Sequence, residues 1–143
     1  MPSHEREWTI GENTFRFEAP DLLWGKLRGE CRMEEAIPMV KLYRELGTVQ
    51  PFFSLGDMGE AGGMEPEARR YIIEHVQPEW VLGVIYFKTR LLHKALLKGF
   101  ILAAQMMREE SPPQTKIYFA STQEDARELA VQLRAANASR PPE

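Results

Sequence analysis

Apolar and polar positions divide the chain into short strand-like segments and longer helical ones. The densest apolar run covers residues 81–87, and a helical pattern of apolar positions follows it over residues 90–109. A strand that is apolar on both faces and leads directly into a helix is typical of a sheet covered by helices. This segment therefore predicts an α/β architecture.

The first thirty residues predict three strands. Two segments in which apolar and polar residues alternate flank a short break at Gly11-Glu12-Asn13, which is the pattern of a β-hairpin. The apolar positions of this hairpin are Trp8, Ile10, Phe15 and Phe17. Residues 22–29 form the third predicted strand, with Leu23 facing the core and Trp24 on the opposite face. We expect Trp24 to pack beneath a helix.

The remainder of the chain alternates between helices and strands. Pro38 falls inside the first predicted helix, so we expect an irregular first turn there. The predicted helices cover 34–46, a segment opening at Glu65-Pro66, 90–109 and a segment after Ser121-Thr122; the predicted strands cover 51–57, 81–87 and 116–120. The resulting fold is a single-domain α/β protein with a mixed sheet, in which an antiparallel hairpin precedes a β-α-β-α-β-α-β-α succession.

The charge and composition of the chain argue against several classes of protein. Lysine and arginine number 18 against 21 acidic residues, for a net charge of −3, so the chain lacks the basic footprint of a general nucleic-acid binder. The single cysteine, Cys31, excludes an internal disulfide and a multi-cysteine metal site, and a reducing cytoplasm is the simplest compartment. Lys94 and Lys98 interrupt the only candidate membrane span, so we predict no transmembrane segment.

Four segments carry a resemblance to a known group of domains. They are the strand ending Leu27-Arg28-Gly29-Glu30 after the hairpin, Phe52 to Asp57, Met64 to Arg70, and Val84 to Arg90 with the closing Phe119 to Ala126. In these the chain resembles the STAS-like, SpoIIAA-like group, which is also likened to the CRAL-TRIO lipid-binding fold. The resemblance covers nearly all of residues 7–134, and we expect residues 1–6 to form a flexible N-terminus and 135–143 a disordered tail. It implies a small cytoplasmic bacterial module that binds a partner or a ligand.

The chain departs from the anti-sigma-factor antagonists of that group at one place. Those proteins carry a phosphorylatable serine after the aspartate that ends the strand, whereas residues 58–64 here contain no serine, threonine or tyrosine. The resemblance therefore does not extend to a switch operated by a kinase.

The first candidate site follows Asp57, where a strand is predicted to meet a glycine-rich loop over residues 59–63. Gly59, Glu60 and Gly62 belong to this loop, and glycines permit backbone conformations closed to other residues. One interpretation is a loop at the carboxyl edge of the sheet that binds a partner or ligand. The other is an aspartate that makes local turn hydrogen bonds.

The second candidate site is Lys88-Thr89-Arg90, at the end of the central strand. Thr89 is placed to cap the following helix, and the amides of a helix N-terminus attract anions. Arg90, Lys94 and Lys98 recur every four residues and form a basic stripe that suits an anionic ligand or an acidic partner, or else is a solvated helix face.

The helix predicted over 90–109 is apolar around more than half of its circumference. That surface is either deeply buried, a homodimer interface, a pocket for an apolar ligand or a membrane-contacting face. The histidines and Cys31 show no metal-ligand spacing and no catalytic partner, so we expect no catalytic residues, no metal and no cofactor. The leading hypothesis is a non-catalytic module that binds a protein partner or a second copy of itself. The alternative is a carrier of an anionic small molecule or lipid.

Overall fold

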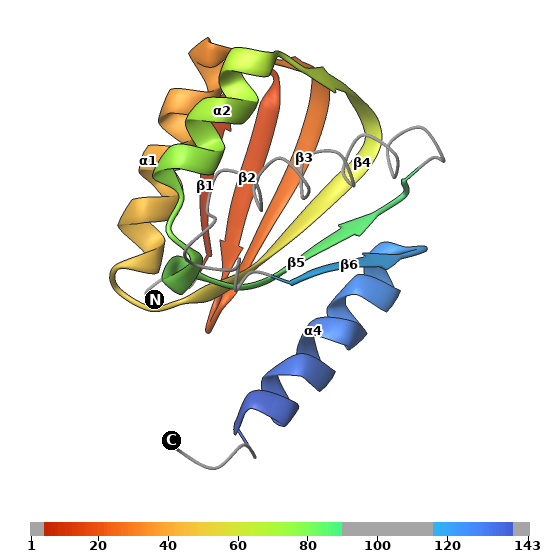
Figure 1. The fold of residues 1–143 in the computed structure, drawn as a ribbon. Coiled ribbons are helices and arrows are strands. Elements are labelled where there is room, and N and C mark those ends of the chain that lie inside the picture. Colours follow the sequence, from red (N-terminus) through yellow and green to blue (C-terminus); the bar gives the residue numbers. More distant parts are fainter. Residues whose placement is uncertain (1–4, 90–115, 139–143) are drawn as a thin grey trace.

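The computed structural model describes residues 5–89 and 116–138, which form one mixed sheet with helices on both faces (Figure 1). The strands are β1 (Glu5–Ile10), β2 (Asn13–Glu18), β3 (Leu22–Cys31), β4 (Phe52–Met64), β5 (Val81–Phe87) and β6 (Ile117–Ala120). The helices are α1 (Met33–Gly47), α2 (Pro66–His75) and α4 (Gln123–Ala138), with one turn of 3-10 helix at Pro78–Trp80.

The six strands lie in the sheet in their order along the chain, from β1 to β6. β1, β2 and β3 pair antiparallel, whereas β3, β4, β5 and β6 pair parallel. The hairpin between β1 and β2 turns through Gly11 and Glu12, and the φ of +61° at Gly11 is one that glycine adopts at no steric cost. The mixed sheet predicted from the sequence is thereby confirmed.

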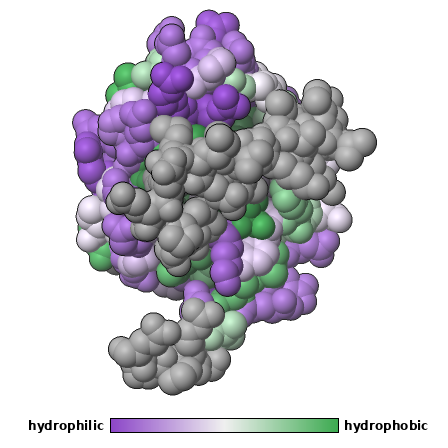
Figure 2. All heavy atoms as spheres, in the orientation of Figure 1, coloured by the Kyte–Doolittle hydropathy of each residue, from purple (hydrophilic) through white to green (hydrophobic). Residues whose placement is uncertain are grey.

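Each face of the sheet carries its own hydrophobic core. Consecutive residues of a strand point to opposite faces, so Phe52 contributes to one core and Phe53 to the other. The core beneath α1 contains Ile10, Phe15, Leu23, Leu42, Leu46, Phe52 and Val81; the core beneath α4 contains Leu22, Trp24, Phe53, Leu55, Ile85, Phe87, Ala126 and Ala130. Trp24 thus packs beneath a helix, as its position in the strand predicts. In Figure 2, hydrophilic side chains gather over the α1 and α2 end of the molecule.

The ends of α1 and α2 are fixed by carboxylates. Glu35 accepts a hydrogen bond from the backbone N–H of Arg32 (2.9 Å), and Glu65 accepts one from Met33 (3.1 Å), which ties the start of α2 to the start of α1. Pro66 occupies the first turn of α2, as predicted. α1 begins at Met33, so Pro38 lies in its second turn rather than near its start.

α4 is held against the sheet by two arginine–carboxylate pairs, which we call the α4 clamp. Arg127 donates from both terminal nitrogens to the two oxygens of Glu18, and Arg134 donates to both oxygens of Asp21, with Nε 3.1 Å from Oδ2. The Arg127 guanidinium also lies over the ring of Trp24, 4.9 Å from the ring centroid. Thr122 caps the helix by accepting the N–H of Asp125 (3.1 Å).

Several expectations need correction or lie outside the described residues. The predicted glycine-rich loop at 59–63 is wrong, because β4 continues through it to Met64. The last helix runs to Ala138, four residues into the predicted tail, and β1 begins within the predicted N-terminal extension. The apolar helix expected at 90–109 lies outside the described residues. Among the helices that the structure does describe, none is long and apolar enough to cross a membrane.

Candidate functional site

The face of the sheet that carries α4 changes from apolar to charged along the strands. Trp24 and Leu55 lie in the apolar core beneath α4, and Lys26 and Asp57, two positions further along the same strands, face the same side. Lys26 is exposed, whereas Trp24 and Leu55 are buried. The parallel strands therefore pass from a buried apolar surface near their amino ends to a charged surface near their carboxyl ends.

A β-bulge in β4 brings a second carboxylate onto this charged surface. Lys26 pairs with Asp57 and Arg28 pairs with Glu60, so Met58 and Gly59 together lie opposite the single residue Leu27. In a regular strand, residues 57 and 60 would point to opposite faces. The extra residue restores Glu60 to the face of Asp57 and sets it beside two cations of β3.

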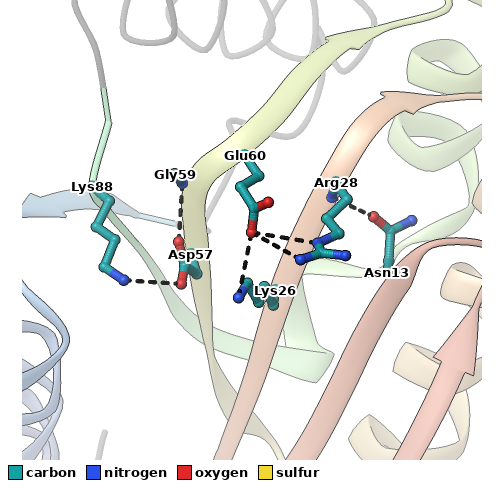
Figure 3. Close-up of polar contacts among 7 residues, drawn as sticks. All are labelled: Asn13, Lys26, Arg28, Asp57, Gly59, Glu60 and Lys88. Atoms are coloured by element: carbon teal, nitrogen blue, oxygen red, sulfur yellow. Dashed lines mark hydrogen bonds and ion pairs between the residues drawn. The ribbon is translucent and has the colours of Figure 1, made fainter.

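Glu60 is held by both neighbouring cations (Figure 3). Its Oε2 lies 3.3 Å from Nζ of Lys26 and 3.3 Å from both Nε and Nη2 of Arg28. The hydrogen bond from Lys26 lowers the pKa of Glu60, and the charge of Arg28 lowers it further. All three side chains are about half exposed, so solvent and salt weaken these contacts.

The backbone beneath Arg28 is anchored by a buried side chain. Asn13 is 4% exposed, and its Oδ1 accepts a hydrogen bond of 2.9 Å from the backbone N–H of Arg28. β2 pairs with β3 only as far as the Thr14–Lys26 pair, so this bond continues the support of β3 beyond the end of the ladder.

Asp57 makes one local contact and one long-range contact. Its Oδ1 accepts the N–H of Gly59 at 2.9 Å, and its Oδ2 lies 3.4 Å from Nζ of Lys88. A Cβ at Gly59 would lie 3.2 Å from Oδ1 of Asp57, so glycine leaves room for this geometry. The Asp57 side chain is 14% exposed, and Lys88 has a φ of 58°, the left-handed conformation, directly after β5.

Two sets of charge pairs lie side by side here, linked by the backbone pairing of Lys26 with Asp57, and we call them together the charged ridge: Lys26, Arg28, Asp57, Glu60 and Lys88. They come from β3, β4 and the residue after β5, and every carboxylate in the group touches a cation of the group. Half-exposed charge pairs of this kind are chemically able to exchange their internal partners for charged groups of another molecule.

Gly62 serves the backbone rather than the ridge. A second bulge places Gly62 and Gly63 opposite Glu30 alone, and a Cβ at Gly62 would lie 3.0 Å from the carbonyl carbon of Gly29. Gly29 itself has a φ of +65°. The glycines predicted to make a binding loop at this point instead let two strands approach closely.

The structure brings together four of the eight residues predicted from the sequence. Asp57, Gly59, Glu60 and Lys88 lie together, whereas Thr89 is half-buried after β5 and Gly62 is further along β4. The predictions for Arg90 and Lys94 fall outside the described residues. Sequence analysis missed Lys26, Arg28 and Asn13. The alternation of Lys26 and Arg28 with Leu27 was the signal that both cations share one face of a strand.

Cys31 ends β3 at the same end of the sheet. Burial raises the pKa of the Cys31 thiol to about 11, with the charges of Glu35, Glu65 and Glu30 adding to the effect, and this disfavours the reactive thiolate. Within residues 5–89 and 116–138, no group of three or more acidic, histidine or cysteine side chains is arranged to hold a metal ion.

Comparison with solved structures finds similar folds. The chain is similar to an uncharacterized protein of the DUF3478 family with a SpoIIAA-like fold from Shewanella loihica PV-4, with a TM-score of 0.55 and 14% sequence identity over 88% of this chain and 91% of that one. It is also similar to the anti-sigma factor antagonist SpoIIAA in its unphosphorylated form, with a TM-score of 0.46 and 8% identity over 84% and 96% of the two chains. No protein-family profile and no curated protein matches the sequence. The chain has the SpoIIAA-like α/β fold that its sequence predicts.

Proposed function

We propose that this protein is a cytoplasmic, non-catalytic interaction module of the STAS-like type, which binds a protein partner through the charged ridge. The observation that carries the proposal is the change along one face of the sheet, from an apolar surface beneath α4 to half-exposed ion pairs beyond it. Charged groups that are exposed, ordered by strands and paired with one another set the specificity and the rate of protein association.

The rigidity of the ridge supports this proposal. Lys26, Arg28, Asp57 and Glu60 all lie within strands, and a buried asparagine supports the backbone at Arg28. Binding groups on strands are held more precisely than groups on loops, and little conformational entropy is lost when they meet a partner. The proposal includes a homodimer, in which the partner is a second copy of the chain bound through the ridge.

The carrier of an anionic or lipid ligand remains a prediction from the sequence. It depends on the apolar residues of the segment 90–109, which lies outside the described residues. Native mass spectrometry of the purified protein separates the two functions, because it reports the number of subunits and any retained ligand together.

The proposal is tested by capturing partners from a lysate of the source organism with the tagged protein and with two double variants. Lys26→Glu/Arg28→Glu reverses two ridge cations, and Lys41→Glu/Arg44→Glu reverses two exposed cations of α1, on the opposite side of the sheet. We expect a partner, or a second copy of the chain in light scattering, that is lost with the ridge variant and kept with the α1 variant. Equal capture by both variants would contradict the proposal.

A further inference from the structure

The contacts of Glu60 resemble those of a bound anion more than those of a structural ion pair. One oxygen, Oε2, receives all three contacts from Lys26 and Arg28, each at 3.3 Å. The side chains of all three residues are between 50% and 51% exposed. An ion pair this long and this accessible to water contributes little stability, so another anion can replace Glu60 at low cost.

The donors are arranged for a carboxylate. Arg28 presents Nε and Nη2, the side of the guanidinium that forms paired hydrogen bonds with carboxylates. Lys26 lies on the same face of β3, and Lys88 is the next cation across the sheet, beyond Asp57. Three cations, two from β3 and one after β5, therefore flank the two carboxylates of β4.

The balance of charge at the ridge is opposite to that of the whole chain. Asp57 is 14% exposed, while Lys26, Arg28 and Lys88 are each at least half exposed, so the solvent-facing head groups are three cations and one carboxylate. The chain as a whole has a net charge of −3. This local excess of positive charge complements a partner that carries several carboxylates in sequence.

We propose that the charged ridge binds an acidic peptide segment of a partner protein, and that Glu60 occupies the place of one partner carboxylate in the free protein. This inference rests on the proposed function and names the chemistry of its partner. Binding releases Glu60 from Lys26 and Arg28 and gives both cations to the incoming segment. Glu60 therefore acts as an internal competitor that lowers affinity for weakly acidic sequences.

The test is fluorescence anisotropy with a fluorescein-labelled octaglutamate peptide, with octaglutamine and an oligothymidine of matched length as controls. We expect the wild type to bind octaglutamate and neither control, with affinity that falls as salt is raised. Lys26→Ala/Arg28→Ala is expected to weaken binding by about tenfold or more, whereas Lys41→Ala/Arg44→Ala is expected to leave it unchanged. Glu60→Gln, which removes the competitor, is expected to tighten it by about two- to fivefold.

Four results would overturn the inference, three of them from the anisotropy measurements alone. If oligothymidine binds as tightly as octaglutamate, the protein attracts any polyanion. If Lys41→Ala/Arg44→Ala weakens binding as much as Lys26→Ala/Arg28→Ala does, the ridge is not the site. If Glu60→Gln leaves the affinity unchanged, Glu60 does not compete with the peptide. A partner whose capture needs the ridge, together with no binding of octaglutamate, would overturn the acidic class of partner and leave the proposed function standing. Binding of octaglutamate at the ridge without any captured partner would instead count against the proposed function. Circular dichroism of each variant confirms that the changes are not those of unfolding.

Discussion

Two sets of ion pairs lie on the same face of the sheet in different surroundings. In the α4 clamp, Asp21 is 6% exposed and Glu18 is 22% exposed, and each carboxylate receives two donors from one arginine. In the charged ridge, Glu60 is 51% exposed and its contacts are all 3.3 Å. Opposite charges in contact hold a helix against the sheet at the clamp, whereas at the ridge they remain exposed to water and, under our proposal, available for exchange.

Burial decides between these two uses. A carboxylate that is removed from water loses hydration and depends on its partner, so losing the partner leaves an uncompensated charge. A carboxylate that stays in water regains hydration when its partner leaves, so the loss is nearly neutral. The clamp should therefore control folding stability, and the ridge should control binding.

The largest loss of stability is expected when the arginine of the most buried pair is removed. Arg134→Ala leaves Asp21 without its bidentate partner, and we expect a loss of about 2–3 kcal/mol in the free energy of unfolding. Chemical denaturation followed by circular dichroism measures it. Arg28→Ala is the matched control from the ridge. An equal loss of unfolding free energy in both variants would show that the clamp and the ridge do not differ in their contribution to stability.

The second test uses pH. Hydrogen bonds from Arg127 lower the pKa of Glu18 below its ordinary value, with smaller contributions from Trp24 and Arg16. A lowered pKa in the folded state gives stability that is present above the unfolded pKa and is lost as pH falls through the folded pKa. We expect Glu18→Gln to cost about 1–2 kcal/mol near neutral pH.

The difference between wild type and Glu18→Gln should then shrink as pH falls below about 4.3, the ordinary value for glutamate. Denaturation curves of both proteins across this range measure the difference. If the difference in the free energy of unfolding between the two proteins stays constant down to the lowest pH, Glu18 acts by packing rather than by charge.

The smallest effect is expected at the ridge. Glu60→Gln removes the charge that Lys26 and Arg28 share, and because the group is exposed we expect no measurable change in the denaturation midpoint. The same variant is expected to change peptide affinity, so stability and binding separate in one protein. A clear fall in the midpoint would show that the ridge helps to hold β3 and β4 together.

Local patterns were sufficient to predict the elements of this fold. The hairpin, the β5 strand and the start of α2 follow from alternation, from a continuous apolar run and from a proline at a helix start, each of which depends on a few neighbouring residues. The parallel order of the later strands follows from their connection by helices.

The site was harder to predict because it depends on register. The sequence predicts that Asp57 and Lys88 lie near each other because the carboxyl ends of parallel strands meet at one edge of a sheet, and the two side chains are in contact. The contact of Arg28 with Glu60 joins residues 32 positions apart and exists only because a bulge shifts the pairing. Glycines at a bulge and glycines in a loop look alike in the sequence, so the pattern at 59–63 predicts a loop where β4 in fact continues.

The bulge at Met58 and Gly59 also lets β4 hold one residue more than β3 without changing which of their side chains share a face. Removing one residue there would restore regular alternation and leave Glu60 two positions after Asp57, on the same face and still opposite Arg28. Related chains that lack this residue would thus present the same charged surface from a strand one residue shorter. In this segment a one-residue deletion is absorbed by the backbone, whereas straightening the strand at its present length would turn Glu60 toward the face of α1.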